Sequence, residues 1–161
     1  MSDSIWTVPS HRVDAGTARR IILAQHQRIR GLLEHARVVA DSALDEEDLP
    51  PDAVASAIGD IHATLDVHLS FEEKVLCDIL EDDLPLGPTR ARRLRGEHAR
   101  QRATLATLHA EARNAPRRPI LAAKLAFLAS WLLDDMAEEE RNLLTPDVVR
   151  DDGVSIDQAT G

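Results

Sequence analysis

The strongest constraint on this chain is an apolar repeat between residues 54 and 79 that two polar residues interrupt. Its apolar side chains recur at alternating steps of four and three residues, which is the spacing of a helix that buries one face in a bundle. His68 and Glu72 occupy two steps of this repeat, where leucine or isoleucine would be expected. A carboxylate is costly to bury unless a positive partner meets it. The repeat therefore predicts a bundle helix that carries an unusual buried charge.

Three further segments show amphipathic helical spacing, and stretches rich in proline and acidic residues separate them. We expect helices over about 14–40, 51–80, 89–114 and 119–145, with Asp14 and Thr89 as N-caps. Short connections between long helices favour antiparallel neighbours. The sequence predicts an all-α fold, an up-down-up-down antiparallel four-helix bundle over residues 14–146. Residues 1–13 are expected to form an N-terminal arm and residues 147–161 a flexible C-terminal tail.

The other three helices also carry metal-ligating residue types on their inner faces. His26 lies on the first helix, His98 on the third, and Asp135 and Glu139 lie one turn apart on the fourth. Counted from the helix ends in antiparallel order, all of these groups fall at one height of the bundle. Three carboxylates buried together would repel one another without cations. We therefore predict a di-metal site with these six ligands: His26, His68, Glu72, His98, Asp135 and Glu139.

Two alternatives to this assignment remain at the level of the sequence. On the fourth helix, the run Glu138–Glu140 blurs the register, so that Met136 and Glu140 could face the site in place of Asp135 and Glu139. For the whole set, the alternative is a metal-free polar core in which Arg102 pairs with the carboxylates. Such a network would reduce stability, because burying ions costs more than their pairing returns.

These motifs resemble a known family. The histidine on the first helix, the His68-x-x-x-Glu72 motif, Glu97-His98 on the third helix and the closing segment 136–146 are similar to the hemerythrin-like, or HHE cation-binding, domain over about residues 15–146. The resemblance implies a non-haem di-iron site with an oxo or hydroxo bridge and one position open to O₂, peroxide or nitric oxide. Manganese and zinc are the alternative metals.

The same resemblance implies a role for each ligand. The three histidines would be terminal ligands, Glu72 and Glu139 would be bridging carboxylates, and Asp135 would be a further terminal ligand. No catalytic residue separate from the metal centre and no other cofactor is expected.

The chain departs from the family pattern at two positions. Asp135 stands where the motif of the fourth helix usually begins with histidine, and Arg102 replaces a second histidine on the third helix. More anionic ligands favour the oxidised metal, so we expect peroxide decomposition, a catalase-like activity, or sensing of O₂ or nitric oxide over reversible O₂ carriage. The alternatives are a di-iron oxygenase acting on an organic substrate and a metal-depleted bundle that serves as a binding or scaffold module.

Composition narrows the expected partners and compartment. The net charge of −9 argues against binding to nucleic acid or to an anionic membrane surface. A single cysteine, Cys77, provides no internal disulfide, and we expect it to be a packed thiol. No apolar run approaches the roughly 20 residues of a membrane span, and no signal peptide is evident. We therefore expect a cytoplasmic protein whose partner is a small peroxide or diatomic ligand.

Overall fold

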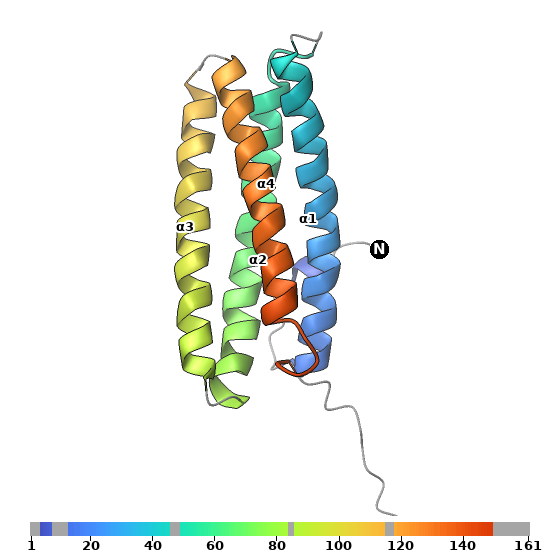
Figure 1. Ribbon diagram of the computed structural model, residues 1–161, viewed down its shortest axis with the longest axis vertical. Helices are drawn as coiled ribbons and strands as arrows, with labels where there is room; N and C mark the ends of the chain where they lie inside the picture. The colour runs from blue at the N-terminus through green and yellow to red at the C-terminus, as the bar shows by residue number, and fades with distance from the viewer. Residues whose placement is uncertain (1–3, 8–12, 46–48, 84–85, 115–117, 150–161) are drawn as a thin grey trace, which may run out of the picture.

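The computed structural model describes residues 4–7, 13–45, 49–83, 86–114 and 118–149. Within these ranges the chain forms a short 3₁₀ helix, η1 (Ser4–Trp6), and four long helices: α1 (Ala15–Leu44), α2 (Ala53–Asp83), α3 (Gly87–Arg113) and α4 (Arg118–Asn142). Figure 1 shows the long helices side by side, each antiparallel to the one before it. The predicted all-α, up-down-up-down four-helix bundle is confirmed. Nowhere in the described ranges is a helix both long and apolar enough to span a bilayer.

The sequence predicted the start of α1 correctly, but not its end or the start of α3. Asp14 is the N-cap of α1, and its carboxylate accepts a hydrogen bond of 2.8 Å from the Thr17 amide. Thr89 was expected to cap the third helix, and this prediction is wrong. The helix already begins at Gly87, behind Leu86, which makes no side-chain cap. Pro88 in the first turn removes only an amide that would have no helical partner.

Gly87 explains why the chain turns so tightly between α2 and α3. A Cβ atom at this position would lie 1.6 Å from the carbonyl oxygen of Leu80, so the two backbones can pass only if residue 87 lacks a side chain. The segment 81–88 was expected to break the chain, yet α2 continues through Asp83. The turn is therefore compressed into very few residues.

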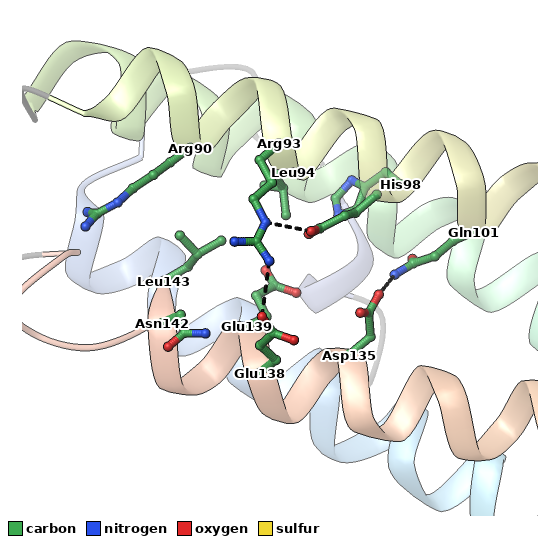
Figure 2. Close-up of a pocket in the computed structure, with 11 residues that line it drawn as sticks. Arg90, Arg93, Leu94, His98, Gln101, Asp135, Glu138, Glu139, Asn142 and Leu143 are labelled. Atoms are coloured by element: carbon green, nitrogen blue, oxygen red, sulfur yellow. Dashed lines mark hydrogen bonds and ion pairs between the residues drawn. The ribbon is translucent and has the colours of Figure 1, made fainter.

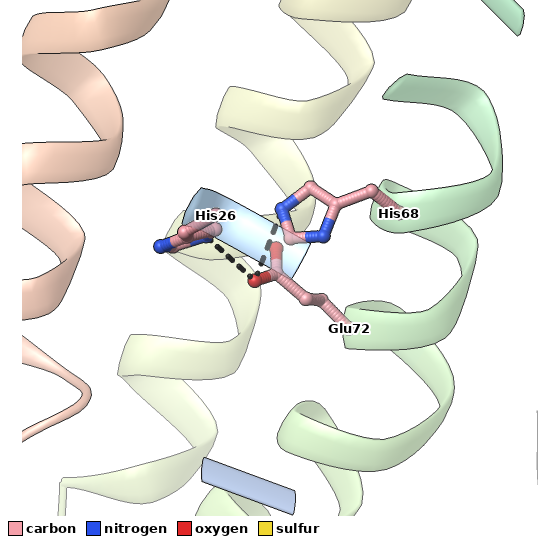
Figure 3. Close-up of side chains that lie close together, drawn as sticks. All are labelled: His26, His68 and Glu72. Carbon is pink, nitrogen blue, oxygen red and sulfur yellow. Dashed lines mark ion pairs between the residues drawn. The ribbon is translucent and has the colours of Figure 1, made fainter. Parts of the chain in front are cut away.

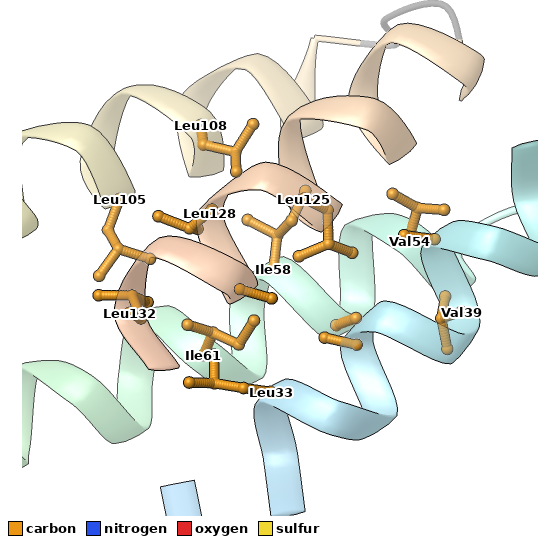
Figure 4. Close-up of a cluster of buried hydrophobic side chains, with 14 of the residues drawn as sticks. Leu33, Val39, Val54, Ile58, Ile61, Leu105, Leu108, Leu125, Leu128 and Leu132 are labelled. Carbon is orange, nitrogen blue, oxygen red and sulfur yellow. The ribbon is translucent and has the colours of Figure 1, made fainter. Parts of the chain in front are cut away.

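The larger hydrophobic cluster fills the end of the bundle where α1 ends and α2 begins. Its side chains interlock in successive layers, as Figure 4 shows. The large buried residues labelled there are Leu33, Val39, Val54, Ile58, Ile61, Leu105, Leu108, Leu125, Leu128 and Leu132. All four long helices contribute to this cluster, so it fixes their packing.

A smaller hydrophobic cluster lies at the opposite end of the bundle. Ile22, Phe71 and Leu94 belong to it, together with Leu144 and Val149 from the segment that follows α4. Arg19 anchors this segment by donating a hydrogen bond to the carbonyl oxygen of Leu144. The tail predicted for residues 147–161 begins inside this segment, and beyond residue 149 it falls outside the described residues.

Candidate metal centre

A layer of buried polar residues separates the two hydrophobic clusters. His26 lies between Ile22 of the smaller cluster and Ile29 of the larger, and the other helices change cluster at the same height. In the described ranges, all buried polar side chains belong to this layer: Gln25, His26, His68, Glu72, His98 and Gln101. Among the described residues, hydrophobic clusters lie on both sides of this layer, and the fully buried polar side chains are concentrated in it.

Glu72 is the centre of the layer. Its Oε1 atom lies 3.4 Å from Nε2 of His26 and 3.3 Å from Nε2 of His68, while its Oε2 atom lies 3.3 Å from Nε2 of His98. Figure 3 shows the first two imidazoles converging on one carboxylate oxygen. The two oxygens of a single, fully buried carboxylate therefore face different histidines.

The outward nitrogen of each histidine has its own acceptor. Each Nδ1–H donates to an oxygen at the edge of the layer, which fixes the orientation of the ring and turns Nε2 inward. The acceptors are Glu140 for His26 (2.8 Å), Gln25 for His68 (2.8 Å) and Glu73 for His98 (3.2 Å). Hydrogen bonds of this kind orient the rings of metal-binding histidines.

The fourth helix presents Asp135 and Glu139 to the layer. The Oε2 atom of Glu139 lies 3.8 Å from Nε2 of His26, and Asp135 accepts a hydrogen bond from Gln101. Both carboxylates line a pocket that also exposes His98 (Figure 2). The structure thus brings all six predicted residues to one height, with Asp135 the outermost.

The alternative register on α4 does not face the layer. Met136 is 5% exposed and packs in the larger hydrophobic cluster. Glu140 lies outside the ring of imidazoles, where it accepts from His26 and pairs with Arg30 at 2.8 Å. It supports a histidine and does not compete with Glu139 for the centre.

Comparison with known proteins agrees with this arrangement. A family model described as the hemerythrin HHE cation-binding domain matches residues 17–145, which contain every residue of the layer. The chain belongs to this family. No curated protein and no solved structure shows significant similarity to it. A hemerythrin-like domain binds metal cations, typically iron, and the His26–His68–Glu72 cluster of this chain has the composition and spacing of such a site.

The two central carboxylates of this hemerythrin-like domain have opposite electrostatics. Burial disfavours the charge of Glu72, but the three surrounding histidines outweigh it and hold the pKa of Glu72 well below its usual range. Burial and the nearby charge of Glu72 raise the pKa of Glu139 well above its usual range. Burial also lowers the pKa of His68 to about 4, so this imidazole is neutral at pH 7. A cation between the carboxylates would favour the ionised form of both.

Unpaired atoms show that the layer fits a metal ion. Among the described residues, Nε2 of His26, both oxygens of Glu72 and Oε1 of Glu139 are buried without a well-formed hydrogen bond. Buried polar atoms are rarely left without a partner. Bonds of about 2.0–2.2 Å from a metal place neighbouring nitrogen and oxygen ligands about 3 Å apart, close to the separations around Glu72. The donor set suits a transition metal, and iron, manganese and zinc all accept these ligands.

Arg102 does not neutralise the centre. Its guanidinium pairs with Glu73 at 2.6 Å and with Asp66 at 3.2 Å, both at the edge of the bundle. In the part of the chain that the structure describes, Arg102 forms no ion pair with Glu72 or Glu139. The metal-free alternative required Arg102 to pair with the buried carboxylates, but Arg102 pairs with carboxylates at the edge of the bundle.

Sequence reasoning missed the residues that support the ligands. Gln101 follows His98 by three residues and precedes Leu105 by four, so it occupies a step of the inner face that could have been recognised. Gln25 is directly adjacent to His26 and does not stand at a step of the apolar repeat, so the spacing did not predict that it is buried. Of the other histidines, His62 and His109 stack on each other with ring centroids 4.8 Å apart.

Proposed function

We propose that this protein is a hemerythrin-like domain that holds a di-iron centre and reacts with a small oxidant. The observation that carries the proposal is Glu72, whose two oxygens face separate imidazoles at 3.3–3.4 Å. A carboxylate in this position can bridge two ions, with His26 and His68 on one side and His98 on the other. Glu139 would be a second bridge and Asp135 a terminal ligand.

The surroundings of the centre favour a small reactant. When bound, the iron pair would supply redox and Lewis-acid chemistry. The protein itself orients the imidazoles, excludes bulk water with the hydrophobic clusters on both sides, and leaves a cavity of about 280 Å³ beside His98 and Glu139. This volume is at the lower end of the range of about 300–1,000 Å³ that sites for drug-sized organic molecules occupy. We favour peroxide, O₂ or nitric oxide as the reactant over the organic substrate of an oxygenase.

Peroxide decomposition is the reaction we favour. Two molecules of hydrogen peroxide give two molecules of water and one of dioxygen, so the reaction is balanced without an external reductant. Three carboxylate ligands favour the oxidised metal, and an oxidised centre suits this turnover better than it suits reversible O₂ carriage. We place this activity in the cytoplasm, since the single cysteine is a buried free thiol.

Metal analysis tests the centre directly. Protein purified without a tag after iron supplementation should contain about two irons per chain, the stoichiometry of carboxylate-bridged di-iron bundles, and should show an oxo-bridge absorption band. Protein that holds no transition metal under these conditions would leave only the scaffold alternative.

Oxygen release after addition of peroxide tests the activity. His68→Ala and Glu72→Ala should abolish it, because each removes an inward-facing ligand atom. His62→Ala is the matched control, since this histidine lies on the same helix but outside the layer, and it should leave the rate unchanged. Equal rates in all three variants would assign the peroxide chemistry to something other than this centre.

A further inference from the structure

The buried centre is closed off at three of the four seams between neighbouring helices. Its inner ligands are almost completely buried, with His68 and His98 each 2% exposed and Glu72 fully buried. An ion or reactant must therefore pass between two helices to reach them. The four pairs of neighbouring helices differ in how tightly the space between them is closed at the height of the centre.

Two seams are closed by ion pairs that continue to a ligand. Between α1 and α4, Arg30 pairs with Glu140, which accepts from His26. Between α2 and α3, Arg102 pairs with Glu73, which accepts from His98. In both places the sealing carboxylate also orients an imidazole, so opening the seam would disturb a ligand.

The seam between α1 and α2 is closed by Gln25 and the 3₁₀ helix η1. The side chain of Gln25 is fully buried, accepts from His68 and donates to the carbonyl oxygen of Ile5 in η1. The helix η1 packs against both α1 and α2. Both the backbone of η1 and the side chain of Gln25 therefore close the space between α1 and α2.

The seam between α3 and α4 is different. These two helices pack against each other far less than the other neighbouring pairs do, and the cavity of about 280 Å³ opens between them. His98, Asp135 and Glu139 line its inner wall (Figure 2). The Oε1 atoms of Gln101 and Glu139, which also border the cavity, are buried without a hydrogen-bond partner. The polar wall of the centre is thus turned towards this opening.

Arg93 spans the mouth of this cavity. It extends from α3, contacts Glu97 on its own helix at 2.8 Å, and reaches Glu138 on α4 at 3.1 Å (Figure 2). Its side chain is 69% exposed, and exposed ion pairs contribute only about 0–1 kcal/mol. Unlike the seals of the other seams, this contact ends on carboxylates that touch none of the three histidines.

The charges along the cavity suit a cation. Four carboxylates, those of Glu97, Asp135, Glu138 and Glu139, line the cavity against two arginines, Arg90 and Arg93, so a cation that displaces Arg93 meets carboxylates along its path. A lining dominated by one sign of charge concentrates ions of the opposite sign. We propose that divalent cations reach the centre through the α3–α4 cavity and that Arg93 is a displaceable latch over its mouth. This inference rests on the proposed metal centre.

Metal-exchange kinetics test the route without any measurement of turnover. Apoprotein prepared with a chelator is mixed with Co²⁺ and loading is followed by ligand-field absorption, while release is measured into excess EDTA. Arg93→Ala should accelerate both loading and release by about two- to fivefold, the range that loss of an exposed ion pair allows. The ratio of the two rates, and hence the Kd, should stay constant, because a latch changes the barrier and not the bound state.

Two further variants separate a latch from general effects. Arg95→Ala removes an equally charged, exposed arginine of α3 that pairs with Glu81 away from the cavity, and it should load Co²⁺ at the wild-type rate. Asn142→Trp places a bulky side chain on the wall of the cavity and should slow both loading and release.

The outcomes distinguish this inference from the function on which it rests. If wild-type protein loads Co²⁺ but Arg93→Ala and Arg95→Ala exchange at the same rates, the metal centre stands and the route is wrong. If release alone accelerates and the Kd rises with it, Arg93 holds the structure of the site and is no latch. If wild-type protein binds no Co²⁺ or iron, both proposals fall together.

Discussion

The larger hydrophobic cluster and the polar layer are built from the same helical repeat, yet they place opposite demands on folding. In the cluster, each inward step carries an aliphatic side chain, and burial of apolar surface stabilises the fold. In the layer, the same steps carry imidazoles, amides and a carboxylate, whose desolvation opposes folding. The bundle therefore derives its stability from one region and its chemistry from another.

This division explains why the layer can hold unpaired atoms at all. Glu72 is fully buried with both oxygens lacking a well-formed hydrogen bond, an arrangement that an isolated helix pair could not sustain. Hydrophobic clusters on both sides hold the four helices in place whether or not an ion is bound. The four predictions that follow would break or sharpen this comparison, and they are ordered from the largest expected effect to the smallest.

Truncation in the larger cluster should reduce stability without changing metal binding. Leu125 is fully buried, and Leu125→Ala should lower the free energy of unfolding by about 2–5 kcal/mol in apoprotein and metal-loaded protein alike. Urea denaturation measures the loss, and metal analysis should give unchanged stoichiometry. A variant that lost its metal in proportion to its stability would show that the two regions are not independent.

Metal removal should destabilise the protein by a comparable amount. An ion that binds only the folded state stabilises it by about 4 kcal/mol when free metal exceeds the Kd about a thousandfold. The thermal midpoint should therefore fall on chelation in wild-type protein. In Glu72→Gln, which keeps the size of the side chain, chelation should leave the midpoint unchanged. A midpoint that does not respond to chelation in wild-type protein would contradict the division.

Loss of a supporting amide should weaken metal binding more than folding. Gln25→Leu removes the acceptor that orients His68 and should lower metal affinity about 10- to 100-fold, as measured by competition with a chromophoric chelator. Gln27→Leu changes an exposed glutamine of the same helix and serves as the matched control. Equal affinities in the two variants would show that the orientation of His68 does not depend on Gln25.

The smaller cluster should show its effect at alkaline pH. Burial raises the pKa of the Cys77 thiol from its ordinary value of 9.0 to about 11. Between these values the unfolded chain releases the thiol proton while the folded chain keeps it, so the contribution of Cys77 to stability declines as pH rises from 9 to 11. Because the chain contains no tyrosine, ultraviolet titration of the thiolate in apoprotein can measure this directly. Cys77→Ala supplies the baseline, and a midpoint near 9 would contradict the expected burial.

Periodicity made the layer predictable, because His26, His68, Glu72 and His98 each stand at a step of an inner face. The same argument placed Asp135 and Glu139 but left Met136 and Glu140 as alternatives, since a run of three glutamates does not show which of them faces the centre. The packing of Met136 against the larger cluster and the pairing of Glu140 with Arg30 distinguish the two registers.

The remaining features depend on contacts that spacing does not encode. The start of α3 at Gly87 follows from a close backbone approach to Leu80, which no local capping rule would reveal. The contacts of Gln25 and of Arg93 each join elements that are remote in sequence. Their partners are set by how the helices are rotated and aligned, and those degrees of freedom are fixed by the whole core.

Two hydrogen bonds, between Ile5 and Gln25 and between Gln25 and His68, connect η1 to the centre. A change at η1 can therefore alter the centre from a distance. A tag, a fusion partner or a proteolytic cut that pulled Ser4–Trp6 away from the bundle would free the amide of Gln25 to rotate. The imidazole of His68 would then lose its fixed orientation although no residue of the polar layer had changed. Protein that carries an amino-terminal extension should accordingly be compared with untagged protein before any spectrum is assigned to the centre.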